Sequence, residues 1–109
     1  MPGAIASVAC ANGKIHHFVC VKKDGTLGHV IATFDNEDKL TWSMGDLAGQ
    51  AHQLSQIVIN CRDKTADPPS LDVLYQNSSF AVVAMERPAG ASSWSNRGEF
   101  SSLIRYRLG

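Results

Sequence analysis

Apolar and polar residues alternate with a period of two along most of the chain, which is typical of half-buried β-strands. The clearest example is FVCVKKDGTLGHVIATF, residues 18–34, in which two apolar-rich runs flank Asp24-Gly25. An Asp-Gly pair tolerates the positive φ angles of a two-residue turn, so this stretch predicts a β-hairpin. The expected strands, those of the hairpin included, cover residues 4–10, 15–22, 27–34, 40–44, 54–61, 71–76, 80–86, 91–94 and 100–108.

Helical periodicity is almost absent. The one candidate helix, residues 44–58, contains Gly45 and Gly49, which are unfavourable in a helix interior. Many short strands separated by turn residues indicate an all-β fold. A chain of 109 residues has the size of one domain, so we treat residues 1–109 as a single unit.

The hairpin design occurs a second time in LDVLYQNSSFAVVAM, residues 71–85. This second hairpin suggests an internal duplication into two four-stranded, blade-like units at residues 4–53 and 54–99, with a surplus strand at 100–108. Chance similarity between β-hairpins is the alternative explanation. Three pairs of landmarks keep a nearly constant spacing of 51 to 53 residues: Cys10 with Cys61, Leu27 with Phe80, and Trp42 with Trp94.

Two blade-like units cannot close a ring, because each blade needs a neighbour on both of its faces. Open sheet edges would also invite aggregation. We therefore expect a homo-oligomer in which several copies form one propeller and the surplus strand completes the first blade of the next copy. A β-sandwich or a barrel is the alternative fold.

The composition narrows the function classes. Ten basic residues balance ten acidic ones, which argues against a nucleic-acid partner. The chain contains no run of 18 apolar residues, so no membrane span is predicted. Its first residues also lack the basic region of a signal peptide. We interpret Cys10, Cys20 and Cys61 as buried thiols in a reducing compartment, with one disulfide and one free thiol as the alternative. These features predict a cytoplasmic protein or one secreted without a leader.

Three segments and two tryptophans carry a resemblance to a known family: IASV at residues 5–8, the turn at 24–27, the strand at 71–76, Trp42 and Trp94. Together they resemble the blades of the small bacterial and fungal fucose-binding β-propeller lectins. The resemblance spans the whole chain. It implies two-blade subunits that assemble as trimers into six-bladed rings, with sugars as ligands.

In that family an Arg of the second strand and a Glu of the third clamp the sugar. Neither residue is retained here, so we expect fucose to bind poorly. The corresponding positions hold His17 or Phe18 and His29 in the first unit, and Leu71 or Asp72 and Val82 in the second.

Aromatic rings still offer a platform for a sugar, because their faces stack on sugar C–H groups and bury apolar area. Polar side chains then supply orientation and specificity. The predicted ligand-binding residues are Trp42, Trp94, His17, His29, Ser95, Asn96 and Arg97. We expect no cofactor and no metal: His17, His29 and Cys20 could approach one another, but their spacing matches no metal-binding pattern.

The sequence thus predicts a lectin without catalytic activity, binding a glycan as a homo-oligomer, with a trimer favoured. A protein-interaction or inhibitor domain with no sugar site is the alternative. A small hydrolase ranks last, because no catalytic triad or metal motif is present. Arg105 and Arg107 in the final strand are interpreted as charges that guard a sheet edge.

Overall fold

The computed structural model describes residues 4–10, 13–62 and 68–100, which form two four-stranded antiparallel sheets. In each sheet, strands that follow one another in the chain lie side by side. Sheet 1 contains β1 (Ile5–Cys10), β2 (Ile15–Val21), β3 (Thr26–Phe34) and β4 (Leu40–Gln50). Sheet 2 contains β5 (Ile57–Arg62), β6 (Ser70–Gln76), β7 (Val82–Arg87) and β8 (Ser95–Phe100).

The prediction of an all-β chain is confirmed, and the candidate helix at 44–58 is wrong. β4 continues through Gly45 to Gln50, because Leu47 packs into the core and Gly49 lies directly against the Tyr75 ring, where a larger residue would not fit. The strand expected at 91–94 is also misplaced, since β8 begins at Ser95. The final expected strand falls almost wholly on 101–109, outside the described residues. No helix in the described ranges has the length and apolar character to span a bilayer.

The first hairpin has a three-residue loop, so the predicted two-residue turn is wrong. The Lys22 N–H donates to the Thr26 carbonyl (2.8 Å), and the Gly25 N–H donates back to the Lys22 carbonyl (2.9 Å). Within the loop only Gly25 has a positive φ, of +88°. A residue in this left-handed conformation commonly closes three-residue hairpin loops. The Asp24 carboxylate accepts from both the N–H and the hydroxyl of Thr26, and these bonds hold Asp24 outside the left-handed region.

The second hairpin repeats this loop. The Asn77 N–H donates to the Ala81 carbonyl (2.9 Å), and Phe80 has a φ of +65° at the position that corresponds to Gly25. The Asn77 side chain accepts from two N–H groups of the loop, which helps to hold the strained Phe80 in place. The structural counterpart of Phe80 is therefore Gly25, not Leu27 as the sequence spacing suggested.

We call residues at equivalent positions of the two sheets counterparts. The side chains of counterparts point in opposite directions: where one faces the space between the sheets, the other faces away from it. Leu27 is buried between the sheets, whereas its counterpart Val82 pairs with Phe100 on the outer side of sheet 2. Ile5 is 67% exposed on the outer side of sheet 1, whereas its counterpart Ile57 is buried. Each sheet therefore turns a different face of the repeated pattern toward the other sheet.

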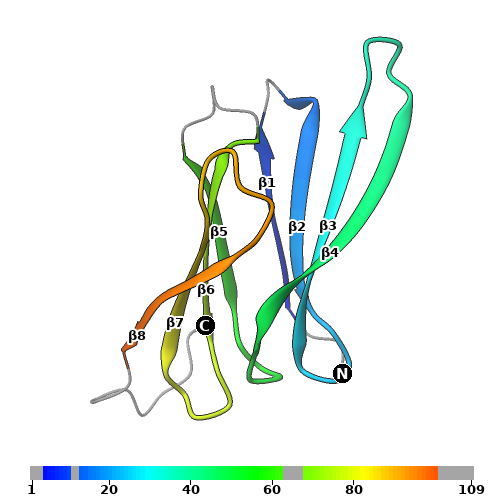
Figure 1. Ribbon diagram of the computed structural model, residues 1–109. Coiled ribbons are helices and arrows are strands. Elements are labelled where there is room, and N and C mark those ends of the chain that lie inside the picture. Colours follow the sequence, from blue (N-terminus) through cyan, green and yellow to red (C-terminus); the bar gives the residue numbers. More distant parts are fainter. Residues whose placement is uncertain (1–3, 11–12, 63–67, 101–109) are drawn as a thin grey trace.

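The apolar core lies between the facing, or inner, sides of the two sheets. β1 and β5 lie next to each other at the centre, and β4 and β8 lie at opposite outer edges (Figure 1). A smaller cluster of Cys10, Cys61 and Leu71 extends the core toward Trp94. The main core comprises Val19, Val21, Leu27, Leu47, Ala51, Ile57, Val73, Tyr75, Val83 and Met85.

A disulfide between Cys10 and Cys61 joins β1 to β5. The interpretation of these two cysteines as thiols is therefore wrong, and the alternative of one disulfide with one free thiol is the arrangement found. Cys20 is the free cysteine, on the outer side of sheet 1 beside Ile5 and Gly28. The location of the protein inside or outside the cell stays a prediction.

Replacing Cys10 and Cys61 by Ser should lower the free energy of unfolding by about 2 to 4 kcal/mol, because the disulfide closes a long loop in the unfolded chain. Denaturant unfolding of the variant and of the native protein measures the difference. Cys20→Ser is the control and should unfold like the native protein. Alkylation of the unreduced, unfolded protein at all three cysteines would contradict the disulfide.

Candidate functional site

Four side chains form a polar and aromatic cluster between the two sheets: His17 of β2, His29 of β3, Arg87 of β7, and Trp94 just before β8. We call it the inter-sheet cluster. His17 shares the inner face of β2 with Val19, and Arg87 continues the inner-facing series of β7 after Val83 and Met85. The exposed fractions of His17, His29 and Arg87 are only 2%, 4% and 6%.

The two histidines contact each other directly. Val19 of β2 pairs with His29 of β3, and His17 lies two residues before Val19 on the same face of β2. His17 is therefore the diagonal neighbour of His29 across the two strands. Nδ1 of His17 lies 3.0 Å from Nε2 of His29, and the rings stack with centroids 5.2 Å apart. Such a bond needs one protonated and one unprotonated nitrogen, and two neutral imidazoles provide that combination.

The surroundings keep both imidazoles neutral at neutral pH. Burial lowers the pKa of His17 to about 4, with further contributions from the positive charges of Arg87 and His16. Burial likewise lowers the pKa of His29 to about 4, assisted by His17 and then by Arg87. The cluster therefore presents hydrogen-bonding rings without charge beside one guanidinium.

Trp94 connects the histidines to the core. Its ring meets the His29 ring edge-on, with centroids 5.4 Å apart and an interplanar angle of 85°. The half-buried indole also packs against both apolar clusters, so it is neither fully in the core nor free on the surface.

Arg87 is buried without a counter-charge among the described residues. Its Nε and Nη2 atoms have no hydrogen-bond partner among the described residues, and neither has Nε2 of His17. Burial lowers the pKa of Arg87, but a guanidinium stays protonated in proteins. Arg87 lies near enough to His17 and His29 to lower their pKa values. A buried unpaired charge is costly, so the three unsatisfied polar atoms of Arg87 and His17 mark a candidate binding site.

The remaining predicted residues lie elsewhere. Trp42 is 62% exposed on the outer side of sheet 1. Ser95 and Arg97 lie on the outer side of sheet 2, where each contacts Glu86. The Asn96 side chain accepts from the Gly98 N–H and so shapes β8 locally. The structure thus brings together only His17, His29 and Trp94 of the predicted set.

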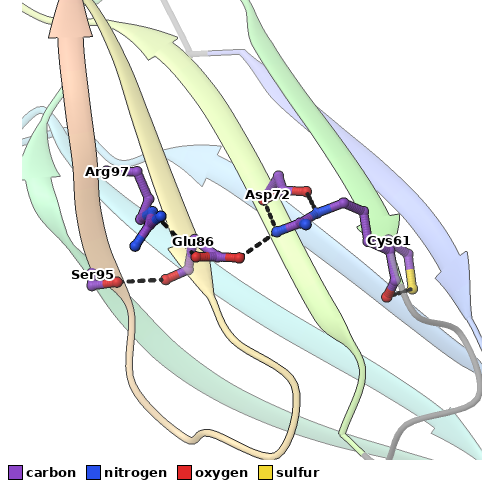
Figure 2. Close-up of polar contacts among 6 residues, drawn as sticks. Cys61, Asp72, Glu86, Ser95 and Arg97 are labelled. Atoms are coloured by element: carbon purple, nitrogen blue, oxygen red, sulfur yellow. Dashed lines mark hydrogen bonds and ion pairs between the residues drawn. The ribbon is translucent and has the colours of Figure 1, made fainter.

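Charged residues line a groove of about 460 Å³ on the outer side of sheet 2, which we call the outer groove. Arg62 on β5 binds Asp72 of β6 and Glu86 of β7, and Glu86 also meets Arg97, Nε to Oε1 at 3.4 Å (Figure 2). These ion pairs leave the charges of the outer groove mutually balanced. Its lining includes Asn60, Arg62, Asp72, Leu74, Ala84, Glu86 and Arg97.

Cys20 does not lie near the two histidines, as a shared metal site would require. It faces the outer side of sheet 1, whereas both imidazoles face inward. Within residues 4–10, 13–62 and 68–100 no group of three or more His, Cys, Asp or Glu is placed to hold a metal ion.

Sequence reasoning missed Arg87. The available signal was the alternation in β7, where Val83, Met85 and Arg87 share one face. A charged residue that continues an inward-facing apolar series predicts a buried charge with a special role.

Acidification from pH 7 to pH 5 should destabilise the protein through the two histidines. Their folded pKa values lie below the unfolded value of 6.5, so the unfolded chain takes up protons that the folded chain does not. The expected loss is about 2 kcal/mol for each imidazole. Denaturant unfolding at both pH values measures it. His17→Gln with His29→Gln should remove most of this pH dependence, whereas His16→Gln is the control and should retain it.

No family model, curated protein or solved structure matches the chain. The resemblance to the fucose-binding propeller lectins therefore stays a prediction. What the protein does must be inferred from the placement of its own side chains, above all those of the inter-sheet cluster.

Proposed function

We propose that the protein is a lectin without catalytic activity, which binds a glycan at the inter-sheet cluster. The observation that carries this proposal is that the Trp94 ring meets His29, which contacts His17, while His17 and the neighbouring Arg87 carry polar atoms without partners among the described residues. Such a site offers aromatic surface for stacking and a few fixed polar atoms for orientation, the combination that small polar ligands use. The four members of the cluster include no hydroxyl, thiol or carboxylate that could act as a nucleophile beside the imidazoles.

The sugar should not be fucose bound in the manner of the resembling family. The positions of the Arg and Glu clamp hold other residues on β2 and β3, and Arg87 approaches from the other sheet instead. The ligand itself is therefore to be found by screening.

Native protein on a broad glycan array should bind at least one glycan class. Trp94→Ala should weaken that binding roughly thirtyfold, since truncating a central aromatic anchor costs about 2 kcal/mol. A thermal melt checks the fold of the variant, and Trp94→Phe, which keeps a ring, replaces it if the fold is lost. Trp42→Phe is the matched control, with binding unchanged. Absence of any glycan binding by native protein would overturn the lectin proposal.

We also propose that the chain assembles head to tail into a closed homo-oligomeric propeller, with a trimer of six blades favoured. The outer side of sheet 1 exposes Ile5, Trp42 and Met44, the last at 80%. The outer side of sheet 2 exposes Val58, Leu74 and Phe100. Apolar side chains gathered on two sheet faces indicate that both are covered in the functional state.

The repeated pattern supports head-to-tail contact. The inner face of sheet 1, with Leu27, has the outer face of sheet 2, with Val82, as its counterpart. The inner face of sheet 2, with Ile57, has the outer face of sheet 1, with Ile5, as its counterpart. A second copy that laid its sheet 1 on the free sheet 2 would thus reproduce the packing already present within one chain. Heterologous contacts of this kind close into a ring when the rotation between successive copies closes, and build an open filament when it does not.

The proposed assembly would place Trp42 at the contact between copies. Trp42 pairs with Ala32, the counterpart of Arg87, and therefore occupies in sheet 1 the place that Trp94 occupies beside sheet 2. Asp72 and Ala84, which line the outer groove, are the counterparts of His17 and His29. Each contact between copies would set Trp42 of one copy over the outer groove of the next.

The native protein should have the solution mass of a trimer in light scattering or native mass spectrometry. Met44→Glu should yield monomers, because a buried carboxylate at the contact between copies would lack a partner. Gln53→Glu adds the same charge in an exposed loop and is the control, with the mass unchanged. A native monomer would rule out the two-blade ring.

The exposed outer side of sheet 1 also favours a second candidate function, a protein-interaction domain. Trp42 and Met44 are residue types enriched in binding surfaces, and both are largely exposed. This candidate takes precedence if native protein is monomeric and binds no glycan.

A further inference from the structure

The unpartnered atoms of Arg87 have a definite geometry. Nε and Nη2 are the two nitrogens on one edge of the guanidinium, and both lack a partner among the described residues. Two parallel N–H groups on one edge match the two oxygens of a carboxylate, which binds them side by side. The free edge of Arg87 is therefore shaped for a planar oxyanion rather than for a single hydroxyl.

The described part of the chain does not supply that anion. Glu86 adjoins Arg87 in the sequence but points to the opposite face of β7, where it binds Arg62 and Arg97. Asp72 lies on the same outer face and is also paired with Arg62. The carboxylates of β6 and β7 thus balance charges on the outside, and the inner guanidinium is left alone.

The histidine pair can assist an anion. When His29 Nε2–H donates to His17 Nδ1, the neutral His17 carries its remaining proton on Nε2, which is the atom without a partner. The cluster then presents a third N–H donor in addition to the two of Arg87. The opposite tautomer would present an acceptor, so binding of an anion selects the donor form.

We propose that Arg87, with His17, binds a carboxylate group, and that the ligand of the inter-sheet cluster is an acidic, carboxylate-bearing sugar. The identity of the ligand as a sugar rests on the lectin function proposed above. The carboxylate site itself rests only on the burial and free edge of Arg87.

The experiment compares methyl glucuronide with methyl glucoside, and sodium acetate with sodium chloride at equal ionic strength. Calorimetry on native protein should show the glucuronide binding at least tenfold more tightly than the neutral glucoside, and acetate should raise the melting temperature more than chloride. Arg87→Met should remove both differences. Arg87→Lys keeps the charge but loses the two-pronged edge, so it should weaken glucuronide binding at least tenfold. Lys23→Met, in the exposed loop of the first hairpin, is the control for general charge loss, with binding unchanged.

Stability of the ligand-free variants separates binding from a purely structural role. Arg87→Met should be at least as stable as native protein, because it removes an unpaired buried charge and keeps most of the packing volume. A large loss of stability on this substitution, with no anion effect on native protein, would overturn the proposal.

The two proposals fail separately. Equal binding of acidic and neutral sugars refutes the carboxylate site and leaves the lectin in place. An acetate effect that depends on Arg87, with no sugar bound on any array, supports the carboxylate site and refutes the lectin. If acetate, methyl glucuronide and the acidic glycans of the array all bind native protein no better than Arg87→Met, the carboxylate site is wrong.

Discussion

The packing of sheet 1 against sheet 2 is the contact on which the structure depends. Neither four-stranded sheet has a second layer of its own, so each must bury one apolar face against the other. Leu27 and Val19 on one side meet Tyr75 and Val83 on the other, and the Cys10–Cys61 disulfide joins the central strands. Separation of the sheets would expose the whole core at once, which predicts a cooperative unit rather than two independent ones.

The same interface contains the polar atoms that the core does not satisfy. A guanidinium and two imidazoles lie within an otherwise apolar layer, and three of their nitrogens lack partners in the part of the chain that the structure describes. Replacement by well-packed apolar residues would usually be at least as stable. The presence of Arg87 and His17 there is the basis of the proposed ligand site.

The outer faces pose the complementary problem. Among the described residues, hydrophobic side chains on the outer sides of both sheets lie exposed, because each sheet packs only its inner side against the other. The repeated pattern makes these two faces counterparts of the two inner faces. The proposed head-to-tail assembly would cover both outer faces with a second copy of the chain.

The sequence by itself determined the strand order and the two-hairpin repeat, because alternation and turn residues are local properties. It located most strands within a few residues, and three of its candidate site residues, His17, His29 and Trp94, lie together in the structure. It could not show that Gly25 corresponds to Phe80, since one loop places Gly and the other a strained Phe at the same left-handed position. It offered a disulfide only as the alternative to three thiols, without assigning the pair, and it missed Arg87. Only the tertiary structure decided which face of each strand turns inward, and therefore which charges find partners. Arg87 and Glu86 are neighbours in the chain, yet Arg87 is buried with no carboxylate partner among the described residues and Glu86 lies in an ion-pair network, because successive residues of a strand point to opposite faces.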